Sequence, residues 1–152
     1  MLYDVYRLFA RNEKQQSYQH IKQDAKRRID NWKREFSIYK FEDDLSLINQ
    51  DRYDDSLEAL KQLINYCMEH GYQPILVLPP VSPCLSEYFT DEVREKYIYS
   101  FIEKCNIDGV PFIDYIDDTQ FKDQDLYMTS FTLNKKGRKV FTARLLKDIA
   151  VL

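Results

Sequence analysis

The chain has 152 residues, of which 44% are hydrophobic and 31% charged, and its formal net charge is -3. A chain of this length can bury about two-thirds of its unfolded surface in one domain, and this composition excludes an intrinsically disordered protein. Gly is scarce, with 3 residues, and no GxGxxG, GxxxxGKS or GxxxxGKT segment occurs, so we expect no nucleotide cofactor.

The sequence also bears on location and metal binding. No apolar run approaches the roughly 18 residues of a membrane-spanning helix, and no secretion signal is present. We therefore expect a cytoplasmic protein without membrane contact, or an extracytoplasmic one if the chain is a fragment of a longer membrane-anchored protein. Cys67, Cys84 and Cys105 are widely spaced and form no CxxC pair. We interpret them as buried free thiols and expect no metal site and no cofactor.

Residues 1–50 are predicted to be a helical region. An apolar segment, residues 2–9, precedes one long helix over residues 13–37, and the apolar residues of this helix recur at steps of three to four: Ile21, Ala25, Ile29, Trp32 and Phe36. Its other face is basic, with nine Lys or Arg against four acidic residues between Arg11 and Lys40. Because acidic residues interrupt this cluster, we interpret it as a solvated face and expect no nucleic-acid partner.

A polar, acidic segment over residues 42–55 is predicted to be a loop, and Asp54 or Asp55 is expected to cap the next helix. Whether residues 36–41 form a strand is left open. Gly71 is expected to end the helix in the left-handed conformation, with His70 as a terminal cap residue rather than a catalytic base. The apolar face of the helix comprises Leu57, Leu60, Ile64 and Cys67.

Two strands and the helix between them follow. The apolar run Ile75–Leu78 is bounded by Pro and predicts a strand buried on both faces. Thr90 is expected to cap a helix over Asp91–Cys105, and Val110–Tyr115 predicts a second strand. A right-handed crossover makes these strands parallel neighbours.

Ligands of open α/β sheets bind beyond the carboxyl ends of the parallel strands. In this chain, Pro80 and Ser82 follow the first predicted strand, and Asp114 lies at the end of the second, close to Asp117 and Asp118. We expect Ser82 at the rim of this crevice. The acids are interpreted mainly as turn formers.

The last helix is predicted over Lys135–Ile149, with Asn134 as its N-cap. Gly137 lies one turn inside the helix, where Gly costs roughly 1 kcal/mol relative to Ala. We interpret it as the residue that lets the helix approach the sheet closely. The helix is expected to bury Gly137, Phe141, Leu145 and Ile149.

Ser130, Leu133, Asn134 and Gly137 fit a pattern that resembles the last sequence block of the SGNH (GDSL-type) esterase and acyltransferase superfamily, Asp-Ser-x-His-Leu-Asn-x-x-Gly. The resemblance is to the branch that acts in teichoic-acid D-alanylation and polysaccharide O-acetylation, whose Pro-rich turn is similar to residues 79–84. The catalytic Asp and His of the triad would fall on Thr129 and Thr132.

The resemblance covers roughly residues 52–152 and implies an α/β fold. The expected fold is part of a three-layer, flavodoxin-like SGNH sheet, with two parallel strands, helices on both faces and the long N-terminal helix. Residues 1–50 and the SGNH-like region 51–152 would form one compact domain. Neither a Gly-Asp-Ser nor a Gly-x-Asn-Asp segment is present, so the nucleophile and the oxyanion donors of the family are missing.

We therefore expect a non-catalytic SGNH-like module with a structural or partner-binding role. No catalytic residue is assigned, and the possible crevice or binding residues are Pro80, Ser82, Asp114, Ser130 and Asn134. Two alternatives are an esterase or O-acyltransferase of cell-surface polysaccharide whose nucleophile comes from a missing N-terminal part or another chain, and a basic-helix module that binds nucleic acid or a membrane surface. Open strand edges and residues 2–9 predict self-association, or a partner chain that completes the sheet.

Overall fold

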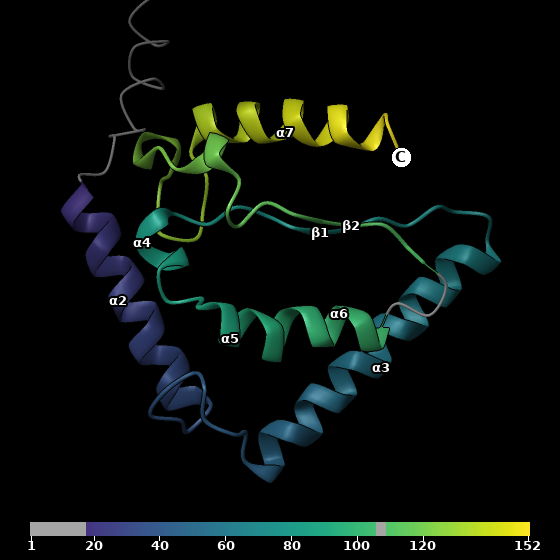
Figure 1. Ribbon diagram of the computed structural model, residues 1–152, viewed down its shortest axis with the longest axis horizontal. Helices are drawn as coiled ribbons and strands as arrows, with labels where there is room; N and C mark the ends of the chain where they lie inside the picture. Colours follow the sequence, from purple (N-terminus) through teal and green to yellow (C-terminus); the bar gives the residue numbers. More distant parts are fainter. Residues whose placement is uncertain (1–17, 106–108) are drawn as a thin grey trace, which may run out of the picture. The chain divides into compact units, whose positions relative to one another are not determined.

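The computed structural model describes residues 18–105 and 109–152 (Figure 1). They form an α/β structure that is mostly helical and contains a sheet of two parallel strands. The chain divides into two compact units, the first made of Met1–Lys26, Pro80–Ser86 and Ile116–Leu152, the second of Arg27–Pro79 and Glu87–Tyr115. The apolar segment 2–9 and the predicted helix start at residues 13–17 lie outside the described residues.

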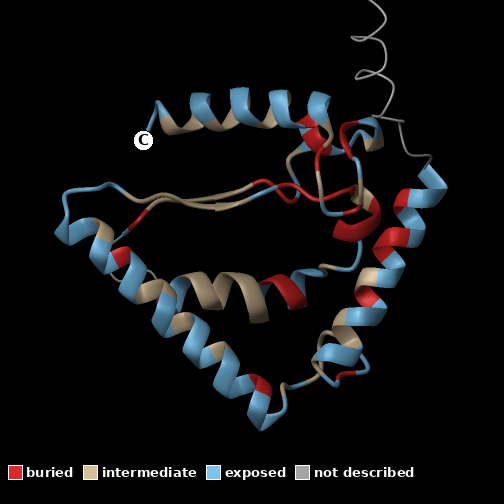
Figure 2. Ribbon diagram, turned by 180° about the vertical axis from the view of Figure 1, so that it is seen from behind, coloured by how far each residue is buried: buried red, intermediate tan, exposed pale blue. Residues whose placement is uncertain are grey.

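Helix α2 spans Tyr18–Glu35 and confirms the long helix predicted for this region. Its apolar stripe is buried at Ile21, Ala25 and Ile29, each at most 2% exposed (Figure 2). The helix ends in a Schellman motif: Ser37 has a φ of 53°, its N–H donates to the Arg34 carbonyl, and Ile38 N–H donates to the Lys33 carbonyl at 2.9 Å.

Residues 36–41 form turns and bends, so the possible third strand is not present. The left-handed Ser37 reverses the chain direction, and the backbone N–H groups of Tyr39 and Lys40 donate to the Asp43 carboxylate at 2.9 and 2.8 Å. These bonds, led by that from Lys40, lower the pKa of Asp43. An extended strand would separate these groups.

Helix α3 spans Leu47–Glu69, and its predicted start was wrong. Ser46, not Asp54 or Asp55, is the N-cap, and its side chain accepts a hydrogen bond from Asn49 N–H. The first two turns were interpreted as a loop because they are polar, and their apolar residues Leu47 and Ile48 face solvent. The predicted end is confirmed, since Gly71 has a φ of 77° and His70 is the C-cap.

Strands β1 (Leu76–Leu78) and β2 (Phe112–Asp114) pair in parallel, as predicted, with Leu76 opposite Phe112 and Leu78 opposite Asp114. The strands are half-buried, so the expected burial on both faces is wrong. In a sheet of two strands each strand has one unpaired edge, which leaves less of it covered than in a wider sheet.

The predicted helix Asp91–Cys105 is confirmed as a continuous helical segment (Figure 1). It consists of α5 (Asp91–Arg94), the π-helix η1 (Glu95–Tyr99) and α6 (Ser100–Cys105), and Thr90 caps it by accepting from Val93 N–H. Cys105 is buried with Ile64 of α3 and with Val110, and these three residues form a hydrophobic core cluster in the second unit. The π-helical turn was not predicted, because hydrophobic periodicity does not resolve one inserted residue.

The first unit contains α4 (Pro83–Ser86), the 3-10 turns η2 (Thr119–Phe121) and η3 (Gln124–Leu126), and α7 (Lys135–Ile149). The bounds of α7 are those predicted. Gly137 is its fully buried residue, while Phe141, Leu145 and Ile149 are half-buried. A Cβ on Gly137 would lie 2.2 Å from the Leu126 carbonyl oxygen, so the close approach is to this segment and not to a strand of the sheet.

None of the helices in the described ranges combines the length and the apolar character needed to cross a bilayer.

Candidate functional site

The two threonines at the triad-like positions lie in one tight turn of the first unit. Thr129 N–H donates to the Thr132 carbonyl at 3.3 Å, and Met128 N–H donates to the same carbonyl at 2.8 Å. The Thr129 hydroxyl accepts a hydrogen bond from Phe131 N–H at 3.3 Å. Both threonine side chains are half-buried, and their recorded bonds stabilise the turn.

Ser130, between these threonines, is fully buried and bound to a carboxylate. Its Oγ donates to Asp24 Oδ2 at 2.6 Å, and its backbone N–H donates to the same oxygen at 3.0 Å. Asp24 lies on α2 and is 5% exposed. Asp24 is one of the four acidic residues that interrupt the basic face, and nothing local in the sequence indicates a partner 106 residues away.

Ser82 is joined to the same segment, since its N–H donates to the Ser130 carbonyl at 2.9 Å. The side chain is fully buried rather than placed on an open rim, and its Oγ has no hydrogen-bond partner within the described chain. Ser82 N–H and Ser130 therefore belong to one buried hydrogen-bonded cluster with Asp24. Pro80, two residues earlier, is also buried.

Asn134 holds the start of α7. Its Oδ1 accepts from Gly137 N–H at 3.0 Å, its Nδ2 donates to the Asp125 carbonyl at 2.7 Å, and its N–H donates to the Leu126 carbonyl at 2.9 Å. The predicted cap is confirmed, and these bonds use both ends of the side-chain amide.

One of the two histidines, His20, lies four residues before Asp24 on α2, whereas Asp114 and His70 lie elsewhere in the sequence. Asp114 belongs to the second unit, at the end of β2, and accepts a hydrogen bond from the Tyr99 hydroxyl at 2.8 Å. Asp118 caps η2, as expected of a turn former. His20 is exposed on α2, and His70 caps α3 with its Nδ1 2.8 Å from the Tyr66 carbonyl oxygen.

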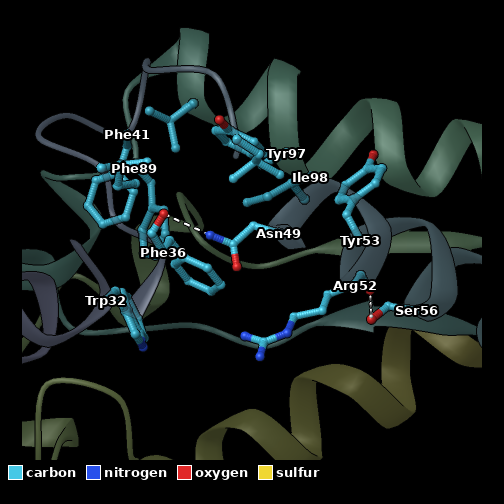
Figure 3. Close-up of a pocket in the computed structure, with 13 residues that line it drawn as sticks. Trp32, Phe36, Phe41, Asn49, Arg52, Tyr53, Ser56, Phe89, Tyr97 and Ile98 are labelled. Atoms are coloured by element: carbon cyan, nitrogen blue, oxygen red, sulfur yellow. Dashed lines mark hydrogen bonds between the residues drawn. The ribbon is translucent and has the colours of Figure 1, made fainter. Parts of the chain in front are cut away.

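A cavity of about 350 Å³ lies in the second unit (Figure 3). Its walls are mostly apolar and come from the end of α2, the loop that follows it, α3, and the helix that starts at Asp91. Six aromatic residues contribute to it: Trp32, Phe36, Phe41, Tyr53, Phe89 and Tyr97. The rings of Trp32 and Phe89 are 6.3 Å apart between centroids and tilted. We call this space the aromatic cavity.

Local geometry explains how the chain encloses the aromatic cavity. Asn49 Nδ2 donates to the Phe36 carbonyl at 2.8 Å and thereby joins α3 to the end of α2. On the π-helical turn η1, Lys96 Nζ donates to the Glu42 carbonyl at 2.8 Å, and the Tyr97 hydroxyl donates to the Asp43 carbonyl at 2.6 Å. The π-helical turn thus binds the loop and lines the cavity. Such turns are frequent at functional sites.

The loop contact is also ionic. Lys96 Nζ lies 2.9 Å from Asp44 Oδ1, and this hydrogen bond raises the pKa of Lys96. Asp44 is almost fully exposed, while Lys96 is half-buried, so the role of the pair is to position the loop rather than to add much stability.

Four polar residues of α3 line the aromatic cavity: Asn49, Arg52, Tyr53 and Ser56. The Arg52 side chain extends along the cavity in Figure 3, and its guanidinium has no hydrogen-bond or ion-pair partner among the described residues. The Tyr53 hydroxyl is buried and has no hydrogen-bond partner there either. Buried polar groups normally have partners, so the Tyr53 hydroxyl offers unused hydrogen-bonding capacity, and the solvent-exposed Arg52 guanidinium adds charged donors.

Sequence reasoning missed the aromatic cavity. Trp32 and Phe36 were assigned to the apolar stripe of a helix, and Phe41 to a possible strand. The available signal was the density of aromatic residues between Trp32 and Phe41, which exceeds what one helical stripe needs.

The described residues contain no group of three or more His, Cys, Asp or Glu side chains that could hold a metal ion. Cys67, Cys84 and Cys105 are free thiols; Cys84 and Cys105 are buried as predicted, whereas Cys67 is half-buried. No family model, no curated protein and no solved structure matches the chain.

Proposed function

We propose that this chain is a non-catalytic module that works by binding, and that the aromatic cavity is its binding site. The observation that carries the proposal is the cavity itself, with about 350 Å³ of space, mostly apolar walls and a few polar groups of α3. Sites for small molecules are typically clefts of about 300–1,000 Å³ with this composition.

The residues of the SGNH-like block support the non-catalytic part of the proposal. A nucleophilic serine needs a base within hydrogen-bond reach, and a threonine hydroxyl has no useful proton affinity near neutral pH. The Ser130 hydroxyl donates a hydrogen bond to the Asp24 carboxylate, which is a possible base. Ser130 is 0% exposed, however, so a substrate does not reach its oxygen. Asn134 and Gly137 serve the docking of α7.

The proposal extends to a relationship with the SGNH superfamily. The two parallel strands would correspond to the last two strands of its three-layer sheet, and a second copy or another chain would complete the sheet. Support comes from the parallel pairing of β1 with β2 and from the residues matched at Ser130, Leu133, Asn134 and Gly137.

Binding can be measured with the protein's own fluorescence. Trp32 is the only tryptophan of the chain and lines the cavity, so an apolar ligand should change its emission (Figure 3). We expect 1-decanol to change it saturably. Ile98→Phe fills the cavity and should abolish the change, whereas Ile102→Phe, the same substitution one turn later and outside the cavity lining, should retain it.

If far-ultraviolet circular dichroism shows a folded protein and the Trp32 emission responds to no apolar probe, the binding proposal is contradicted.

The non-catalytic part of the proposal has a separate test, the hydrolysis of 4-nitrophenyl acetate. We expect the rate to equal that of the buffer. If the protein hydrolyses this ester faster than buffer, and Ser130→Ala or Ser82→Ala removes the added rate, the non-catalytic part of the proposal is refuted.

A further inference from the structure

The aromatic cavity has one charged residue in its lining. Its other lining residues carry aromatic, aliphatic, hydroxyl or amide side chains, and none is an acid. The charged residue is Arg52, a cation, in a chain whose net charge is -3. A bound ligand would therefore meet a positive charge and no negative one within the described lining.

The position of Arg52 suits a ligand with a charged end. The residue is exposed, so its guanidinium reaches solvent while it lines the cavity, and it has no acidic partner among the described residues. A guanidinium presents N–H donors in a planar fork that matches both oxygens of a carboxylate. A carboxylate placed there keeps part of its hydration, which avoids most of the cost of burying a charge.

The size of the cavity limits the apolar part of the ligand. A water molecule occupies about 30 Å³ in the liquid, so 350 Å³ has room for about twelve groups of that size. The Trp32, Phe36 and Phe89 rings provide apolar contact surface for such a chain. Decanoate, with ten carbon and two oxygen atoms, fits this limit.

We propose that the aromatic cavity binds monocarboxylates with an apolar body of about ten carbon atoms, that is, medium-chain fatty acids, and that Arg52 binds the carboxylate. This inference rests on the proposed binding function and assigns its ligand class. Arg52 selects for negative charge, so a neutral analogue binds more weakly and a cationic one more weakly still.

The test is a titration of the full chain with decanoate, 1-decanol and decylammonium, followed by Trp32 emission and by calorimetry. An ion pair open to solvent changes affinity by up to about fivefold. We expect decanoate to bind about fivefold more tightly than decanol, and decylammonium to bind most weakly. Arg52→Gln should bring the three affinities together, while Lys61→Gln, the same loss of charge on α3 outside the cavity lining, should preserve their order.

The outcomes separate the two proposals. Equal affinity for all three ligands in the unaltered chain would overturn the carboxylate inference and leave the binding function intact. A preference for decanoate that survives Arg52→Gln but disappears in Lys104→Gln, on the adjoining polar pocket beside Tyr53, would overturn the assignment of Arg52. No binding of any of the three would refute both proposals.

Discussion

Replacing Gly137 with Ala tests how α7 is docked. At an ordinary helix position this change stabilises a protein by about 1 kcal/mol. Here the new Cβ would lie 2.2 Å from the Leu126 carbonyl oxygen and 2.9 Å from Leu133 Cδ2. To reach 3.0 Å from that oxygen, the helix and the Leu126 backbone must separate by about 0.8 Å. Overpacking of this kind costs roughly 1–3 kcal/mol.

The same movement weakens a hydrogen bond, because Leu126 O accepts Asn134 N–H at 2.9 Å, and such a bond contributes about 1 kcal/mol. After the helix-propensity gain is subtracted, we expect Gly137→Ala to lower the free energy of unfolding by about 2 kcal/mol. The measurement is urea unfolding followed by circular dichroism at 222 nm.

Thr142→Ala is the matched control, because Thr142 lies on the exposed side of the same helix. Thr142→Ala should raise the free energy of unfolding by about 0.5 kcal/mol, because Ala has the higher helix propensity. If Gly137→Ala were as stable as the unaltered chain, or more stable, the contact between Gly137 and Leu126 would not restrain α7 and the reasoning would be refuted.

Three further predictions concern other parts of the chain. The Tyr127 hydroxyl donates to the Phe121 carbonyl at 2.9 Å, and burial raises the pKa of Tyr127. The contribution of the protonated hydroxyl to stability is therefore complete below the unfolded-state pKa of about 10, and it is lost as the pH rises toward the folded-state pKa. Tyr127→Phe should cost about 1 kcal/mol at pH 7 and reduce the loss of stability between pH 10 and 11, measured by urea unfolding; an unchanged pH dependence would contradict this. Ser37→Asn should stabilise the chain by about 0.5 kcal/mol, because Asn adopts the left-handed conformation more readily than Ser, and a lower urea midpoint followed by Trp32 emission would be the contrary result. Exposed apolar side chains on α3, including Leu47 and Ile48 at 85% and 68% exposure, support the proposed self-association, which sedimentation equilibrium at micromolar concentration should detect and a clean monomer would exclude.

Several elements could be predicted from the sequence because their signals are local. The buried stripe of α2, the Thr90 and Asn134 caps and the left-handed Gly71 each depend on residues a few positions apart. The two apolar runs and the intervening helix likewise predicted the parallel pairing of β1 with β2.

Other features depend on contacts between distant residues and had no local signal. The start of α3 was misplaced because its first turns are polar, and Asn49 joins it to Phe36, 13 residues earlier. The bond between Asp24 and Ser130 spans 106 residues and places this serine in a buried hydrogen-bonded cluster.

The sequence by itself determined the local framework of the chain and shows that no Gly-Asp-Ser segment occurs in it. Tertiary structure alone decided where a ligand could be held. The aromatic cavity needs the turn at Ser37, the π-helical turn at Tyr97 and the side chain of Arg52 to meet in one place. Hydrophobic periodicity reports which face of each helix is apolar, but it does not report where facing side chains leave space between them.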